Sequence, residues 1–181
     1  MLDLSCFLAG LINFFVPLFL LLFFKKKFDS GVFPALAAFI ACFPAFITGA
    51  LIRSLFMTDD LLTFYIMQGI LFGILEEGTK YMMLRFFLTS YDRKENTLSY
   101  GIGHSAYEGF GSAISCLGLI GSGKAASDIL SFQIMTVIDR TVFTISLTVL
   151  IFYGIKNGKS KVMLPAAMLL QVHSVSAIQL L

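Results

Sequence analysis

The stretch LLTFYIMQGILFGILEEGTKYMMLRFFL, residues 61–88, decides the class of this protein. Most of it is apolar, and it is long enough for a helix that crosses about 30 Å of hydrocarbon. Near its middle stand Glu76, Glu77 and Lys80. Each charge at such a depth costs at least about 2.5–3.5 kcal/mol, so these residues indicate a function or a specific partner.

The composition of the chain is that of an integral membrane protein. Of 181 residues, 57% are hydrophobic and only 13% are charged, and the mean hydropathy is +0.88. A soluble domain needs a more polar surface than this. We therefore expect a single multi-pass domain over residues 1–181 in the cell membrane, surrounded by the lipid bilayer and without a nucleic-acid partner. Its three cysteines lie in apolar segments and predict no disulfide framework.

Charge clusters and turn-forming residues divide the chain into six apolar segments. Short strands of alternating polarity are not found, so helices are favoured over a barrel. The sequence predicts an all-α bundle of about six transmembrane helices with a polar site near mid-membrane. The expected spans are about 2–24, 31–52, 61–88, 97–120, 132–155 and 162–181.

The distribution of lysine and arginine predicts the orientation. The loops after the second and fourth spans carry only Arg53 and Lys124. By the positive-inside rule, the loops after the odd-numbered spans are cytoplasmic and both termini are extracytoplasmic. The basic residues of those cytoplasmic loops and of the span ends beside them are Lys25, Lys26, Lys27, Arg85, Arg93, Lys94, Lys156, Lys159 and Lys161.

Apart from Asp3 and Arg85, which lie near span ends, eight ionisable residues fall inside the expected spans. One such residue can hold two helices together, but eight in a small protein suggest a shared polar site. They are Glu76, Glu77, Lys80, His104, Glu108, Asp139, Arg140 and His173.

Three of these residues share a depth. Glu77, Glu108 and His173 each lie eleven residues from the expected cytoplasmic end of their span, which is about 16 Å at 1.5 Å per residue. His104 precedes Glu108 by four residues, so both project from one side of their helix. Three spans therefore place Glu or His in one layer.

The spacing of the other charged residues indicates which of them could pair. Glu76 and Lys80 are also four residues apart, so the lysine could offset Glu76 and leave Glu77 for other work. Asp139 and Arg140 lie nearer the outer surface, where they could form a local ion pair or an outer wall of the site.

The chemistry open to these residues is that of carboxylates and histidines. Carboxylates in the spans exceed cations by two charges, which a divalent cation or two protonated carboxyl groups would cancel. Two histidines with a carboxylate are a common zinc set, so His104, His173 and Glu108 are candidate ligands. Glu76 or Glu77 could then take a proton from the attacking water. The chain has neither the HExxH nor the Gly-x-Ser-x-Gly motif.

Three short motifs appear in order along the chain: Glu76-Glu77-Gly78-Thr79-Lys80, Tyr100 to His104 running on to Glu108, and Gln171-Val172-His173. With them the chain resembles the clan of glutamate-dependent intramembrane proteases. That clan includes the CAAX prenyl endopeptidases and their bacteriocin-processing relatives, the PrsW proteases and the YhfC-type proteins. The resemblance is nearest to the YhfC and PrsW types.

The resemblance implies roles for the site residues. Glu76 or Glu77 would activate water, His104 and His173 would bind or orient it, and Glu108 would assist, with Lys80, Asp139 and Arg140 in support. A zinc ion is the cofactor that such a set could hold. Ala177 stands where the prenyl-protein proteases carry Asn or Asp.

Three functions are compatible with these observations. The first is an intramembrane endopeptidase that cuts a membrane-associated peptide or protein. The second is a small membrane transport or substrate-binding subunit, whose polar layer would bind a solute. The third is a non-catalytic scaffold of the same fold.

Overall fold

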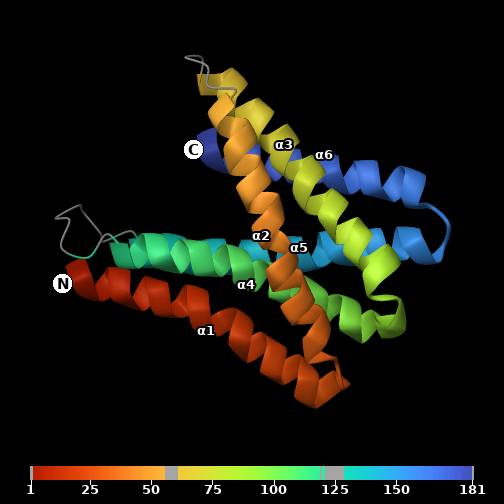
Figure 1. Cartoon of the computed structure of the whole chain (residues 1–181). Helices are drawn as coiled ribbons and strands as arrows, with labels where there is room; N and C mark the ends of the chain where they lie inside the picture. The colour runs from red at the N-terminus through yellow and green to blue at the C-terminus, as the bar shows by residue number, and fades with distance from the viewer. Residues whose placement is uncertain (1, 56–60, 119, 121–128, 181) are drawn as a thin grey trace. The chain divides into compact units, whose positions relative to one another are not determined.

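A computed structural model of the chain describes residues 2–55, 61–118, 120 and 129–180. In these ranges it is almost entirely helical, with six α-helices and two short helices of other types (Figure 1). The α-helices are α1 (Leu2–Phe28), α2 (Val32–Leu55), α3 (Leu61–Met82), α4 (Lys94–Gly118), α5 (Ile129–Lys156) and α6 (Ser160–Leu180). Six α-helices are therefore found where six helical segments are expected, and apart from the end of the third their bounds lie within four residues of the expected ones.

The third helix ends differently from the expectation. The sequence predicts one span over 61–88, but α3 stops at Met82 and a π-helical turn, η1 (Met83–Phe87), follows. Its wider hydrogen-bond pattern is closed by the amide of Leu88, which donates to the carbonyl of Met83 at 2.9 Å. A 3₁₀ turn, η2 (Thr89–Tyr91), then leads towards α4.

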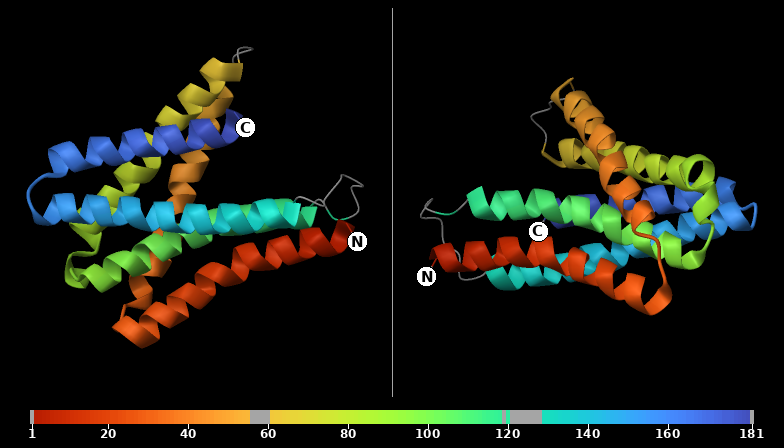
Figure 2. Two further views of the ribbon diagram at one scale, coloured as in Figure 1. Left: turned by 180° about the vertical axis from the view of Figure 1, so that it is seen from behind. Right: turned by 60° about the horizontal axis from the view of Figure 1, so that its bottom comes forward.

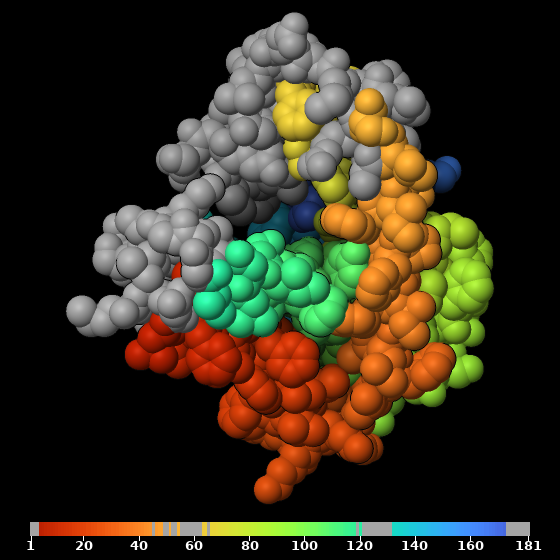
Figure 3. Space-filling view, turned by 60° about the vertical axis from the view of Figure 1, so that its left-hand side comes forward, coloured from red at the N-terminus to blue at the C-terminus, as the bar shows by residue number. Residues whose placement is uncertain are grey.

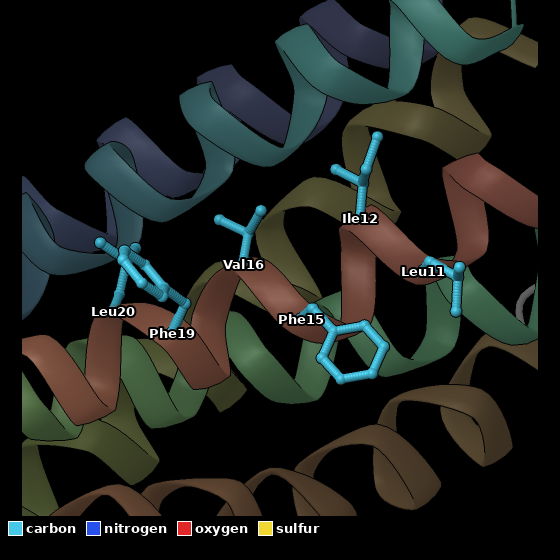
Figure 4. A pocket seen from close by; sticks show the side chains of 6 residues that line it. All are labelled: Leu11, Ile12, Phe15, Val16, Phe19 and Leu20. Atoms are coloured by element: carbon cyan, nitrogen blue, oxygen red, sulfur yellow. The ribbon is translucent and has the colours of Figure 1, made fainter.

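Within the described residues, two helices are long and apolar enough to cross a membrane by themselves, over Leu4–Phe28 and Phe132–Lys156. Shorter apolar stretches cover Val32–Thr48 and Ser160–Val172. Burial follows the pattern of a protein in lipid, because large apolar side chains such as Phe19 (69% exposed) face outward. An open recess on α1, lined by Leu11, Ile12, Phe15, Val16, Phe19 and Leu20, is part of this apolar surface (Figure 4). The chain is a membrane protein.

The chain forms two compact units. Unit 1 comprises Met1–Phe39 and Arg93–Ser146, and unit 2 comprises Ile40–Asp92 and Leu147–Leu181. In unit 1, α1 packs along α4 (Figures 2 and 3). In unit 2, the main contact is between α3 and α6.

Helix α4 is the buried centre of unit 1. The small residues Gly101, Ser105, Gly109 and Ala113, which recur every fourth position, are all buried. At Gly103 the backbone of Ala35 in α2 comes so close that an added Cβ atom would overlap its carbonyl group. Small residues at such crossings let helix backbones approach closely in a membrane protein.

Gly103→Ala is therefore expected to destabilise unit 1 by at least about 1–3 kcal/mol, since backbone atoms cannot move aside as a side chain can. Gly111→Ala is the matched control, because nothing lies within 4 Å of a Cβ atom at that position of the same helix. It should be neutral or stabilising by up to about 1 kcal/mol. The apparent melting temperatures of both variants in detergent measure the contrast, and equal shifts would contradict it.

Candidate functional site

His104 and Glu108 form the centre of a polar cluster in unit 1. One helical turn separates them on α4, and Nε2 of His104 lies 3.2 Å from Oε1 of Glu108. The His104 side chain is 3% exposed and that of Glu108 is 23% exposed. The expected pairing of these two residues on one face of the helix is confirmed.

Arg140 of α5 completes this cluster. Its Nε lies 3.8 Å from Oε2 of Glu108. Its Nη1 donates to Oγ of Ser112 at 3.0 Å, and its Nη2 donates to Oδ1 of Asn13 at 2.9 Å. The guanidinium group therefore joins α5 to both α4 and α1, and compensates the charge of the Glu108 carboxylate.

The expectation of a local ion pair between Asp139 and Arg140 is wrong among the described residues. Arg140 pairs with Glu108 instead, and the Asp139 side chain is exposed. Adjacent residues on a helix point about 100° apart, so one can face the packed interior while the other faces outward. The alternative interpretation, a wall of the site, fits Arg140 alone.

Asn13 of α1 is a member of the cluster that the sequence motifs do not contain. It is fully buried. Its Nδ2 donates to the carbonyl of Ala9 and to Oε1 of Gln133, both at 3.0 Å. An asparagine in an apolar span is a signal for an interhelical hydrogen bond, although it does not name the partner. We call His104, Glu108, Arg140, Asn13 and Ser112 the histidine cluster.

Glycine makes the approach of α1 to this cluster possible. A Cβ atom at Gly109 would lie 2.6 Å from the backbone oxygen of Asn13 and 3.1 Å from Nη2 of Arg140. Ser105 and Thr141, whose hydroxyl oxygens are 2.8 Å apart, tie α4 to α5 beside it. The cluster is therefore held by packing and hydrogen bonds from three helices.

A second polar group, the glutamate cluster, lies in unit 2 and consists of Glu76, Glu77, Lys80 and Gln171. Glu77 and Lys80 are almost entirely buried, and Nζ of Lys80 lies 2.6 Å from Oε1 of Glu77. The other oxygen of Glu77, Oε2, is buried and makes no hydrogen bond to the described residues. An ion pair of this kind keeps a lysine and a glutamate inside a membrane helix.

The expected pairing of Lys80 with Glu76 is therefore wrong, since the lysine pairs with Glu77. Spacings of three and four residues both bring side chains together on a helix, so the sequence alone allows either choice. In the structure Oε2 of Glu76 accepts a hydrogen bond of 2.7 Å from Nε2 of Gln171 in α6. The Glu76 carboxylate is therefore hydrogen-bonded to Gln171 rather than paired with Lys80.

Gln171 is a second residue whose contribution the motifs do not predict. It is largely buried, and the close approach of α6 to α3 places it beside Glu76. A Cβ atom at Gly73, one turn before Glu76 and Glu77, would lie 2.8 Å from the backbone oxygen of Met168. Glu76 itself is only partly buried, in contrast to Glu77.

His173 belongs to α6, but its side chain lies outside the described part of the chain. Its predicted role is therefore neither supported nor contradicted by contacts. Of the other predicted residues, His104, Glu108 and Arg140 gather in unit 1, while Glu76, Glu77 and Lys80 gather in unit 2.

The histidine cluster suits a divalent metal by its donor types. Imidazole nitrogen and carboxylate oxygen both bind zinc at about 2.0–2.2 Å, so two tetrahedral ligands lie roughly 3.3–3.5 Å apart. The 3.2 Å between His104 Nε2 and Glu108 Oε1 is close to that separation. The same distance also suits a hydrogen bond between the two side chains, so no rearrangement of α4 is needed in either state.

The glutamate cluster suits proton transfer. Glu76 is partly accessible and accepts a hydrogen bond from Gln171, and a carboxylate can accept a proton from a neighbouring water. Glu77 is fully enclosed and its charge is compensated by Lys80.

The sequence model of one protein family matches residues 12–121, which is more than half of the chain. The family is described as YhfC intramembrane metalloprotease. The match confirms the resemblance drawn from the motifs, and it includes Glu76, Glu77, Lys80, His104 and Glu108. No curated protein and no solved structure matches the chain.

Proposed function

Because the chain belongs to the YhfC intramembrane metalloprotease family, we propose that it hydrolyses a peptide bond of a membrane-associated peptide or protein. The observation that carries this proposal is the His104–Glu108 pair, which presents a nitrogen and an oxygen 3.2 Å apart within the matched segment. These are ligand types of catalytic zinc sites.

The proposed metal ligands are His104 and Glu108, with His173 as a third donor. Zinc is the proposed metal, because two histidines and one carboxylate are a common ligand set that keeps one position open. When bound, such a metal polarises a peptide carbonyl and lowers the pKa of water towards neutrality.

Glu76 is the proposed general base. It is the more accessible of the two adjacent carboxylates, and Gln171 orients it through one oxygen. It would take a proton from the attacking water and return it to the leaving amine. Glu77 and Lys80 would hold α3 in place as a neutral pair rather than take part in the proton transfer.

The proposed reaction takes place within the bilayer in a six-span, multi-pass protein. The six helices provide the spans, and the basic loops after the first, third and fifth would be cytoplasmic, leaving both termini outside.

Metal content gives the first test. The purified protein is expected to contain about one divalent metal ion per chain, and His104→Ala should reduce this by at least tenfold, because one of about three protein ligands is lost. The control combines Cys6→Ala with Cys116→Ala, which removes the two buried thiols of unit 1. Inductively coupled plasma mass spectrometry measures both. The proposed ligands would be contradicted if the double cysteine variant lost the metal while His104→Ala kept it.

Cleavage gives the second test. The protein would be reconstituted in liposomes with a library of single-span peptides, and products identified by mass spectrometry before and after treatment with a chelator. We expect cleavage that the chelator stops and added zinc restores. Metal-independent cleavage would contradict the metal role. No cleavage together with a co-purifying small solute would favour the transport alternative.

A further inference from the structure

We propose that Arg140 is a positioning residue for the Glu108 carboxylate, and that Asn13 in α1 acts through it. The proposal rests on the proposed function and adds a way in which α1 and α5 control the metal ligand on α4. It concerns residues of unit 1 only.

Two hydrogen bonds orient the guanidinium group of Arg140. Nη1 donates to Ser112 at 3.0 Å and Nη2 donates to Asn13 at 2.9 Å. The guanidinium group is planar, so two hydrogen bonds to two different helices determine where its third nitrogen points. The Arg140 side chain is only 11% exposed, which leaves it little freedom to turn.

The third nitrogen of the guanidinium group, Nε, faces the Glu108 carboxylate. Nε of Arg140 is buried and makes no hydrogen bond to the described residues, and it lies 3.8 Å from Oε2 of Glu108. A buried donor without an acceptor costs about 1–3 kcal/mol. A shift of the carboxylate by less than about 1 Å would bring it to the hydrogen-bond distance of about 2.9 Å.

The two oxygens of the Glu108 carboxylate face different groups. Oε1 of Glu108 faces His104 at 3.2 Å, whereas Oε2 faces Arg140. If Oε1 and His104 bind the metal, Oε2 can accept a hydrogen bond from Arg140. That hydrogen bond would hold the carboxylate in the orientation in which Oε1 binds the metal. Partners of this kind change metal affinity by about 10–100-fold when they are removed.

Asn13 holds the guanidinium group of Arg140 from α1. Its Oδ1 accepts from Arg140 while its Nδ2 is held by the Ala9 carbonyl and Gln133. The amide therefore cannot turn without losing a donor or an acceptor. Gly109 gives the Asn13 backbone the room to come this close.

The test measures zinc affinity of the purified full-length protein by competition with a chromophoric chelator. Arg140→Gln should weaken zinc binding about 10–100-fold. Arg140→Lys should weaken it as well, since lysine keeps the charge but lacks the planar fork. Asn13→Leu should weaken it by a smaller factor, and the double variant Asn13→Leu with Arg140→Gln should be no weaker than Arg140→Gln alone.

Thr141→Val is the matched control. It removes the hydrogen bond to Ser105, which also joins α4 to α5, next to Arg140 in sequence. It should lower the apparent melting temperature and leave zinc affinity within about twofold, because neither Glu108 nor Arg140 loses a contact.

Several outcomes would overturn the proposal. Unchanged zinc affinity in Arg140→Gln would show that Arg140 does not position Glu108. Full affinity in Arg140→Lys would show that Arg140 acts only through its positive charge and not through the geometry of its guanidinium group. Additive losses in the double variant would show that Asn13 does not act through Arg140. A wild-type protein that binds no zinc would overturn the proposed function itself, whereas zinc binding that is insensitive to these variants overturns the positioning role alone.

Discussion

Glu76→Gln is expected to lower the rate of peptide-bond hydrolysis by about 10²–10⁴-fold, the usual contribution of a general base. The substitution keeps the size of the side chain and leaves an oxygen that can accept the hydrogen bond from Gln171 Nε2. The fold and the metal content should therefore be unchanged, while the side chain can no longer take a proton. Product formation from the single-span peptide library in liposomes measures the rate.

Glu95→Gln is the control for the same chemical change. Glu95 lies in the first turn of α4, its ion-pair partner is the exposed Arg93, and it belongs to neither cluster. Its cleavage rate should equal that of the wild type. If Glu76→Gln cleaved normally and Glu77→Gln, still folded, did not, Glu77 rather than Glu76 would be the base.

Lys80→Met should destabilise the protein by about 3–5 kcal/mol, because it leaves the Glu77 carboxylate buried without its cation. The second oxygen of Glu77 already makes no hydrogen bond to the described residues, so this carboxylate has few other groups to compensate it. The free energy of unfolding in mild detergent, measured by chemical denaturation, gives the size of the effect.

The double variant Glu77→Gln with Lys80→Met tests the cause. With both charges gone, no buried ion remains uncompensated, and most of the lost stability should return. If the double variant were as unstable as Lys80→Met alone, the lysine would contribute by packing rather than by charge.

The helical segments could be predicted because a membrane protein marks them in its sequence. Apolar runs must be helical in lipid to satisfy their own backbone groups, and charged or glycine-containing stretches end them. Helix α4 is expected over 97–120 and observed at Lys94–Gly118. The π-helical turn after Met82 was not predicted, because the residues of η1 are as apolar as those of the helix before it.

The partner of each charge could be predicted only within one helix, and there only in part. The pairing of His104 with Glu108 follows from a spacing of four residues. The pairing of Lys80 with Glu77 rather than Glu76 does not, since both glutamates are within reach on the same helix. The contact of Gln171 with Glu76 depends on where α6 crosses α3.

The sequence by itself determined that this is a helical membrane protein of the YhfC family, and it identified the ionisable residues within its helices. It could do so because the cost of burying charge in lipid makes each such residue conspicuous in an apolar run. Only the tertiary structure decided that Arg140 pairs with Glu108 rather than with Asp139, and that it donates to Asn13, 127 residues away in the chain. That contact depends on the close packing of three helices at Gly109, which no spacing along a single helix contains.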